Sequence, residues 1–251
     1  MSNVAVTCTN LVRLEEAKIL AMQLNLPLCE IDSLTYSYQL VITENQLELH
    51  AKNNNYQPIT IDFLRGKYHF RHEHTSRKNE LLAKAVGIKA NFKPYVIDST
   101  AGLGRDGFLL GSLGCRVLML ERNSCLFALL KDALLRFNKN TSLAKNILLD
   151  VIHVDAKDYL TSLTKEDSPD VIFLDPMYPE RQKSALVKKE MRILRDLIGD
   201  DFDAPDLLSL ALRKAKKRVV VKRPRLAKTL SEQNPSLVFA GKSTRFDVYL
   251  M

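Results

Sequence analysis

Residues 95–107 read YVIDSTAGLGRDG, and this stretch decides the fold. An apolar strand leads into Asp98, a glycine-rich turn follows, and a helix is expected to begin near Arg105. Gly102 and Gly104 let the backbone approach a ligand where a Cβ atom would collide with it. The first N–H groups of the helix would point at the same ligand. The order of strand, glycine turn and helix therefore predicts a cofactor site at the end of a parallel strand.

Short apolar runs alternate with helical patterns from residue 77 onward. Strands are expected at 95–98, 116–120, 148–154, 170–174 and 218–222, and helices at 126–137, 187–198 and 205–212. Runs that are apolar throughout are typical of strands buried on both faces of a parallel sheet. The last expected strands, 237–240 and 244–250, flank Gly241 and predict a hairpin. Residues 77–251 are thus predicted to form an α/β domain, with a mostly parallel, doubly wound, Rossmann-like sheet and a C-terminal antiparallel hairpin.

The first 76 residues have a different pattern. Apolar residues at helical spacing over 11–24 predict a helix that ends before Pro27. Alternation over 36–49, with a turn-like centre, predicts a hairpin, and a third short strand is expected at 59–63. Residues 1–76 are therefore predicted to be a small N-terminal α/β module.

Composition and charge limit the class of protein. Of the 251 residues, 37 are Lys or Arg and 29 are Asp or Glu, and the resulting net charge of +8 favours a polyanionic partner such as nucleic acid. No run approaches the roughly 18 apolar residues of a membrane helix, and the start, MSNVAVTCTN, lacks the regions of a signal peptide. The cysteines Cys8, Cys29, Cys115 and Cys125 form no CxxC pair and are expected to be free thiols. We expect a cytoplasmic protein with no membrane association.

The strand expected at 116–120 ends at Glu121, which bears on the kind of cofactor. A carboxylate here accepts hydrogen bonds from both hydroxyls of an adenosine ribose, and the alternative is a solvated glutamate at a strand end. Asp155, after the strand at 148–154, is expected either to cap a helix or to accept from the adenine amino group. Because a nicotinamide dinucleotide and S-adenosylmethionine both carry adenosine, these residues leave both cofactors open.

The strand expected at 170–174 runs into Asp175-Pro176-Met177-Tyr178-Pro179, nearly the Asp/Asn-Pro-Pro-Tyr loop of amino-group methyltransferases. An exocyclic base amine is a poor nucleophile because its lone pair is delocalised into the ring. Asp175 and the Pro176 carbonyl would accept its N–H groups and aim the lone pair at a methyl donor, and Tyr178 would stack on the base. The alternative is a proline-rich turn. The loop favours S-adenosylmethionine over a nicotinamide cofactor.

Several longer blocks occur in order: AVGIKANF (85–92), DSTAGLGRDGF (98–108), GCRVLMLERN (114–123), FLDPMYP (173–179), QKSALVKKEMR (182–192), RVVVKRP (218–224) and KSTRFDVY (242–249). In these blocks the chain resembles the bacterial ribosomal RNA small subunit methyltransferase J family, from about residue 77 to the end and more weakly before it. The resemblance implies a class I methyltransferase fold. It also implies methyl transfer from S-adenosylmethionine to the N2 amine of a guanine in 16S ribosomal RNA.

The resemblance also implies roles for residues at the matching positions. It places Arg105, Asp106, Glu121, Arg122, Asp155, Ala156 and Asp175 at the cofactor, and the glycine turn adds Asp98, Gly102 and Gly104. Asp175, Pro176 and Tyr178 are the expected catalytic residues. Met177 replaces the second proline of the wider loop pattern, and the resemblance indicates that methionine is typical of this family at that position.

Basic residues near this site are candidates for contact with small-subunit ribosomal RNA or a 30S particle. Residues 213–228 read RKAKKRVVVKRPRLAK, and the helix expected at 187–198 carries a basic stripe. We predict phosphate contacts from Lys188, Arg192, Arg195, Lys222 and Arg223, which give affinity and salt dependence but no sequence selectivity. The alternative is a solvated basic surface.

Other functions receive less support from the sequence. His69, His72 and His74 stand near Glu73 but lack the closed ligand set of a zinc site, so no metal is expected. The leading hypothesis is an S-adenosylmethionine-dependent guanine-N2 methyltransferase. A nicotinamide-dependent oxidoreductase with the same glycine turn and a non-catalytic RNA-binding module on the same fold are the alternatives.

Overall fold

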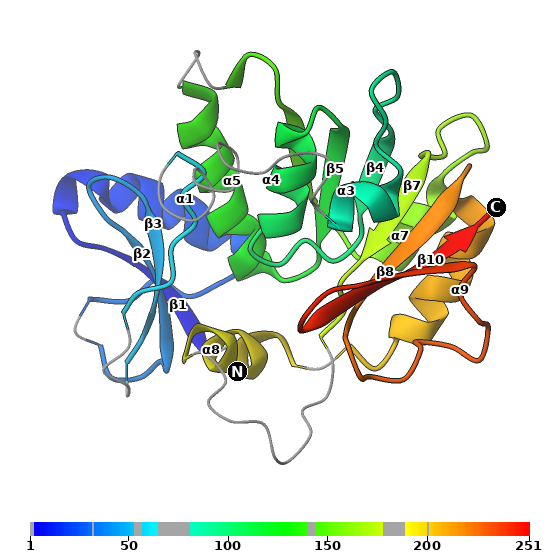
Figure 1. Ribbon diagram of the computed structural model, residues 1–251. Coiled ribbons are helices and arrows are strands. Elements are labelled where there is room, and N and C mark those ends of the chain that lie inside the picture. Colours follow the sequence, from blue (N-terminus) through cyan, green and yellow to red (C-terminus); the bar gives the residue numbers. More distant parts are fainter. Residues whose placement is uncertain are drawn as a thin grey trace.

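The computed structural model describes residues 3–31, 33–52, 57–64, 81–139, 144–177, 189–199 and 201–251. Its main feature is a seven-stranded sheet with the strand order β6-β5-β4-β7-β8-β10-β9 (Figure 1). The strands are β4 (Tyr95–Asp98), β5 (Arg116–Glu121), β6 (Leu148–His153), β7 (Val171–Leu174), β8 (Arg218–Pro224), β9 (Leu237–Ala240) and β10 (Thr244–Leu250). The first five in the sheet order run parallel, and β10 pairs antiparallel with both β8 and β9. The predicted mostly parallel sheet with an antiparallel C-terminal hairpin is confirmed.

Helices cover both faces of this sheet, as expected for a doubly wound fold (Figure 1). One face packs under α3 (Leu81–Val86), α4 (Arg105–Ser112) and α5 (Ser124–Lys139), and the other under α7 (Ala156–Ser162) and α9 (Ala204–Lys214). Successive residues of a strand alternate between the two cores. Thus Val96 belongs to the core beneath α4 and α5, and Ile97 to the core beneath α7 and α9.

The strand order reverses at β4, which lies between β5 and β7. In sheets of this type, the reversal opens a crevice at the carboxyl ends of the strands, where ligands bind. Asp98, Glu121 and Asp175 stand at or directly after the ends of β4, β5 and β7. The topology therefore brings three carboxylates, far apart in the sequence, to one edge of the sheet.

The N-terminal segment forms a second, three-stranded sheet. Strands β1 (Val4–Cys8) and β2 (Tyr38–Ile42) run parallel, and β3 (Leu47–Ala51) pairs antiparallel with β2. The hairpin was predicted, but β1 was not, and the strand expected at 59–63 is reduced to a single bridge between Leu49 and Ile59.

Helix α1 (Leu14–Leu24) follows a short 3-10 helix (Leu11–Arg13) and confirms the predicted helix. Its buried residues are the alanines Ala17 and Ala21. Leu20 and Leu24 pack against the core beside them, whereas Ile19 and Met22 are 49% and 77% exposed. The apolar pattern that predicts this helix therefore marks its packed face only in part.

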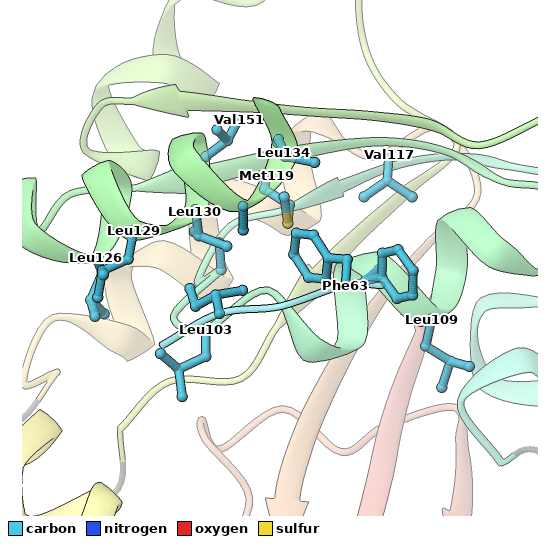
Figure 2. Close-up of a cluster of buried hydrophobic side chains, with 14 of the residues drawn as sticks. Phe63, Leu103, Leu109, Val117, Met119, Leu126, Leu129, Leu130, Leu134 and Val151 are labelled. Carbon is cyan, nitrogen blue, oxygen red and sulfur yellow. The ribbon is translucent and has the colours of Figure 1, made fainter. Parts of the chain in front are cut away.

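The two sheets share one hydrophobic core around Phe63, which lies among side chains of α4 and α5 in Figure 2. The Phe63 ring stacks on Phe108 of α4 with centroids 4.5 Å apart, and Phe137 of α5 meets both rings edge-on. The predicted domain boundary at residues 76 and 77 lies outside the described residues and stays a prediction.

Helix α8 (Lys189–Ile198) also links the two parts of the chain (Figure 1). Ile193 and Leu194 are buried in the shared core, and the Tyr38 hydroxyl of β2 donates a hydrogen bond to Asp196 at 3.5 Å. Within the described part of the chain, no helix combines the length and the apolar character needed to span a bilayer.

Candidate active site

A cavity of about 270 Å³ opens at the carboxyl edge of β4, β5 and β7. Its volume is close to the lower end of the range for small-molecule sites, about 300–1,000 Å³. Most of the residues predicted for the site line it: Asp98, Gly102, Arg105, Asp106, Glu121, Arg122, Asp155, Ala156, Asp175, Pro176 and Lys222. The structure therefore brings the glycine turn, the end of β5 and the loop after β7 together around one space.

The glycine turn contributes to the site in two ways. Gly102 and Gly104 both have positive φ, 56° and 70°. Gly102 lines the cavity, whereas a Cβ atom on Gly104 would lie 2.5 Å from Leu130 of α5 and 3.2 Å from Phe63. Gly104 was predicted to lie beside the cofactor, but its missing side chain makes room for the core behind the turn. Helix α4 begins at Arg105, as predicted.

Glu121 is the buried acidic residue at the end of β5. One carboxylate oxygen accepts from the Gly102 N–H at 2.8 Å, and the other accepts from the Asn123 N–H at 2.7 Å. Burial raises the pKa of Glu121 to about 7, although these two hydrogen bonds oppose the shift. Each oxygen keeps a further lone pair, so the carboxylate is still able to accept from ligand hydroxyls.

Asp155 caps helix α7, because its Oδ1 accepts from the Lys157 N–H at 2.8 Å. This bears out the capping half of the sequence interpretation. Its Oδ2 lies 3.7 Å from an Arg122 nitrogen at the cavity wall. Asp155 and Ala156 both line the cavity. Their contact with adenine stays a prediction.

Two acidic residues that the sequence interpretation missed bind Arg122 in the lining of the cavity. Arg122 forms ion pairs with Asp201 and, at 3.2 Å, with Asp203. Asp203 also pairs with Lys157 at 2.7 Å. The acidic run DDFD at 200–203, directly before a predicted helix, was the available signal.

The loop after β7 is fixed at both of its described ends. The Asp175 N–H donates to the Thr100 hydroxyl at 2.6 Å, and the Met177 N–H donates to Asp201 at 2.6 Å. Pro176 between them is buried and lines the cavity. Tyr178 lies outside the described residues, so its predicted stacking on a base remains untested.

A network of charged groups surrounds the Asp175 side chain. Lys222 of β8 donates to Asp106 at 2.6 Å and to Asp175 at 2.7 Å. Burial, together with the charge of Asp106, raises the pKa of nearby Asp98 to about 8. Asp98 is therefore mostly protonated at neutral pH, while Asp106 and Asp175 share the Lys222 cation.

The cations predicted to contact RNA lie in different environments. Arg192 is exposed on α8, and Arg195 is half-buried on the same helix. Lys222 lies inside the cavity, and Arg223 is buried and donates to the Lys228 carbonyl. Lys188 lies outside the described residues. Of the described cations in this set, Arg192 is the one with the exposure that a phosphate contact needs.

The lining of the cavity suits a ligand with a planar ring, hydroxyls and a positive charge. Leu120, Leu126 and Leu207 provide apolar surface for a ring face, Glu121 offers acceptors for hydroxyls, and the carboxylates at Asp106 and Asp175 complement a cation. S-adenosylmethionine has these three chemical features, so the residues fit it. Among the described residues, no group of three or more His, Cys, Asp and Glu side chains is placed to hold a metal ion, and His69, His72 and His74 lie outside that part of the chain.

Comparison with known proteins gives consistent matches over the chain. A family described as "Putative SAM-dependent methyltransferase" matches residues 20–251. The chain is 49% identical over 248 residues to a ribosomal RNA small subunit methyltransferase J of Coxiella burnetii, covering 98% of this chain and 96% of that protein. It is also 49% identical over 238 residues to the protein of the same name from Thioalkalivibrio sulfidiphilus, with coverages of 94% and 93%.

A solved structure extends the match to three dimensions. The crystal structure of a SAM-dependent methyltransferase from Neisseria gonorrhoeae superposes with a TM-score of 0.76 at 33% sequence identity. The match covers 98% of this chain and 95% of that one. It therefore includes the N-terminal three-stranded sheet as well as the seven-stranded sheet.

Proposed function

Since this chain belongs to the ribosomal RNA small subunit methyltransferase J family, we propose that it methylates the N2 amine of a guanine in small-subunit (16S) ribosomal RNA, with S-adenosylmethionine as methyl donor. One observation carries the proposal. The Asp175-Pro176 loop and the ribose-binding candidate Glu121 line the same cavity, so a base amine and an adenosine-containing cofactor have adjoining places.

The cofactor side of the cavity would bind and orient the methyl donor. Glu121 would accept from the ribose hydroxyls, and Asp155 and Ala156 would bind the adenine side. Arg105 and Asp106, at the start of α4, would bind the other end. When bound, S-adenosylmethionine supplies a methyl group activated by a sulfonium, so the enzyme's main contribution is proximity and orientation.

The Asp175 loop would hold the guanine amine. Asp175 and the Pro176 carbonyl accept the two N–H groups, and this directs the nitrogen lone pair toward the methyl donor. Tyr178 would pack against the base. The surplus proton leaves to solvent after transfer, because no buried base is required for a cationic product of this kind.

The RNA is proposed to reach the cavity along its α8 side. Arg192 is exposed on α8, and Leu194 and Ile198 of the same helix line the cavity. The net charge of +8 supports a nucleic-acid partner. A ribosomal RNA substrate, free or in a 30S particle, also supports a cytoplasmic location.

Methyl incorporation from labelled S-adenosylmethionine tests the proposal. The substrates are 30S particles and 16S ribosomal RNA from a strain that lacks the enzyme, followed by mapping of the modified nucleotide. We expect one guanine to gain one N2 methyl group, and no incorporation into RNA from the parent strain. Binding of the cofactor without incorporation into either substrate would favour the non-catalytic RNA-binding module, and tighter binding of NAD would favour the oxidoreductase.

A further inference from the structure

Lys222 joins two carboxylates that belong to different parts of the candidate site. Its Nζ atom lies 2.6 Å from Asp106 Oδ2 on α4 and 2.7 Å from Asp175 Oδ2 after β7. Its side chain is only 26% exposed. A cation held this way inside the cavity is poorly placed to contact an RNA phosphate, which is the role that the basic sequence around it suggests.

The direction of the Lys222 side chain follows from its strand. Lys222 lies two residues after Val220, so both side chains point to the same face of the sheet. Val220 is buried in the core beneath α4 and α5. At the carboxyl end of β8, that face meets the first turn of α4, which carries Asp106.

The charges around Lys222 show what the lysine contributes. Asp106 and Asp175 both contact it, and the nearby carboxyl of Asp98 on β4 interacts with the same charges. Burial raises the pKa of Asp175, and Lys222, with a weaker contribution from Arg223, opposes that rise. Burial alone would lower the pKa of Lys222, but the charges of Asp175 and Asp106 outweigh burial and raise it. Without the lysine, two carboxylates would face each other, and one of them would take up a proton.

We propose that Lys222 is a positioning residue that fixes the Asp175 carboxylate for the substrate amine and favours its ionised form. Lys222 binds Oδ2 of Asp175, whereas no hydrogen bond joins Oδ1 to a described residue. Oδ1 is thereby available as an acceptor with a fixed orientation. This inference rests on the proposed function, because it assigns Asp175 to the amine.

Lys222→Met, which keeps the length of the side chain without its charge, is the main test. Lys222→Arg is the conservative variant, and Lys217→Met is the matched control. Lys217 stands just before the same strand, is 50% exposed and pairs with Asp170 away from the cavity. Thermal unfolding and circular dichroism are recorded for all three variants, so that only folded proteins are compared.

The first measurement needs no methyl transfer. Carbon-13 NMR of labelled aspartate carboxyls, in the cofactor-free protein, follows the titration of Asp106 and Asp175. We expect Lys222→Met to raise the apparent pKa of Asp175 by at least one unit, and Lys222→Arg and Lys217→Met to leave it near the wild-type position. Unchanged titration in a folded Lys222→Met protein would overturn the inference.

The second measurement is single-turnover methyl transfer with saturating cofactor between pH 6 and pH 9. We expect Lys222→Met to lose at least tenfold in rate at pH 7 and to regain part of it as the pH rises and the carboxylate pair ionises. Lys222→Arg should keep the wild-type pH profile. A Lys222→Met rate within twofold of wild type at every pH would contradict the inference.

RNA binding separates this role from a phosphate contact. If Lys222 only neutralises a phosphate, Lys222→Met would reduce the salt dependence of RNA affinity, with the carboxyl titration unchanged. We expect Lys222→Met to leave the salt dependence of RNA affinity unchanged and to shift the carboxyl titration. If the wild-type protein transfers no methyl group to any RNA, the proposed function fails, and the NMR titration still decides whether Lys222 controls the charge of Asp175.

Discussion

The carboxylate of Glu121 accepts a hydrogen bond from the backbone N–H of Gly102 at 2.8 Å. This bond connects the end of β5 to the glycine turn after β4, two elements that the sequence interpretation assigns separately to the cofactor. A second bond, from the Asn123 N–H, fixes the other carboxylate oxygen. The charge on Glu121 therefore affects both the shape of the turn and its chemistry toward a ligand.

Cofactor affinity is expected to depend on pH through Glu121. Its pKa of about 7 means that the carboxyl is mostly protonated at pH 6 and mostly ionised at pH 8. Because ribose hydroxyls donate more strongly to the ionised form, S-adenosylmethionine affinity should rise across this range. Calorimetry at several pH values measures the effect.

Glu121→Gln is the control for this pH dependence. It should bind the cofactor more weakly by about 1.5–3 kcal/mol at pH 8, the scale of a hydrogen bond to a charged group. The difference between the two proteins isolates Glu121 from ligand groups that titrate in the same range. Equal pH dependence in wild type and variant would remove Glu121 from the cofactor site.

Asp175→Asn is expected to slow methyl transfer by roughly tenfold to a thousandfold, about 1.4–4 kcal/mol in the barrier. The amide keeps the size of the side chain but replaces an anionic acceptor and loses the ion pair with Lys222. Single-turnover transfer with saturating cofactor is the measurement. Asp167→Asn, an exposed change before β7 at the opposite edge of the sheet, should have no effect. A rate for Asp175→Asn within twofold of wild type would exclude Asp175 as the amine acceptor.

Two alanine substitutions in the glycine turn should differ in cost. Gly102→Ala and Gly104→Ala both place an alanine at positive φ, which costs about 1–2 kcal/mol. Only the Cβ atom of Gly104→Ala meets a core side chain at 2.5 Å, whereas the nearest atom to that of Gly102→Ala is at 3.9 Å. Urea unfolding should therefore show a larger loss of stability for Gly104→Ala. Equal losses would mean that the Leu130 and Phe63 side chains behind the turn move aside at little cost in free energy.

Arg192→Ala should weaken RNA binding and lower the slope of log affinity against log salt by about one, the change expected for a single lost phosphate contact. Cofactor affinity should stay the same. Lys165→Ala is the matched control, because Lys165 is exposed before β7, at the sheet edge opposite the cavity. An unchanged salt slope in Arg192→Ala would show that this arginine is simply solvated.

The strands of the main sheet are predictable from the sequence because a strand buried on both faces is a short run of mostly apolar residues. β4 and β7 are short apolar runs buried on both faces, and both were placed within a residue of their observed bounds. β1 was missed although Val4–Cys8 is also a short, buried run, so a local signal was present in the sequence. The ion pairs of Arg122 with Asp201 and Asp203 join residues 79 and 81 positions apart, and such contacts leave no local pattern.

The basic run at 213–228 shows that composition alone does not predict which basic side chains are exposed. Counting charges groups Lys222 and Arg223 with their neighbours as one basic surface. On a strand, however, alternate side chains point to opposite faces, and here Lys222 enters the cavity while Arg223 is buried against the Lys228 carbonyl. Strand alternation, applied to residues 218–224, was the signal that could have separated them.

The stacking of Phe63 on Phe108 has a consequence for the order in which the chain folds during synthesis. Phe63 leaves the ribosome before any strand of the main sheet, yet the rings that enclose it belong to α4 and α5. The early part of the chain therefore has to keep an unburied aromatic side chain until those helices arrive, a situation that favours transient association with chaperones. Lys222 emerges later still, so the cavity is complete only once β8 has been synthesised, and the cofactor can stabilise this fold only from that point.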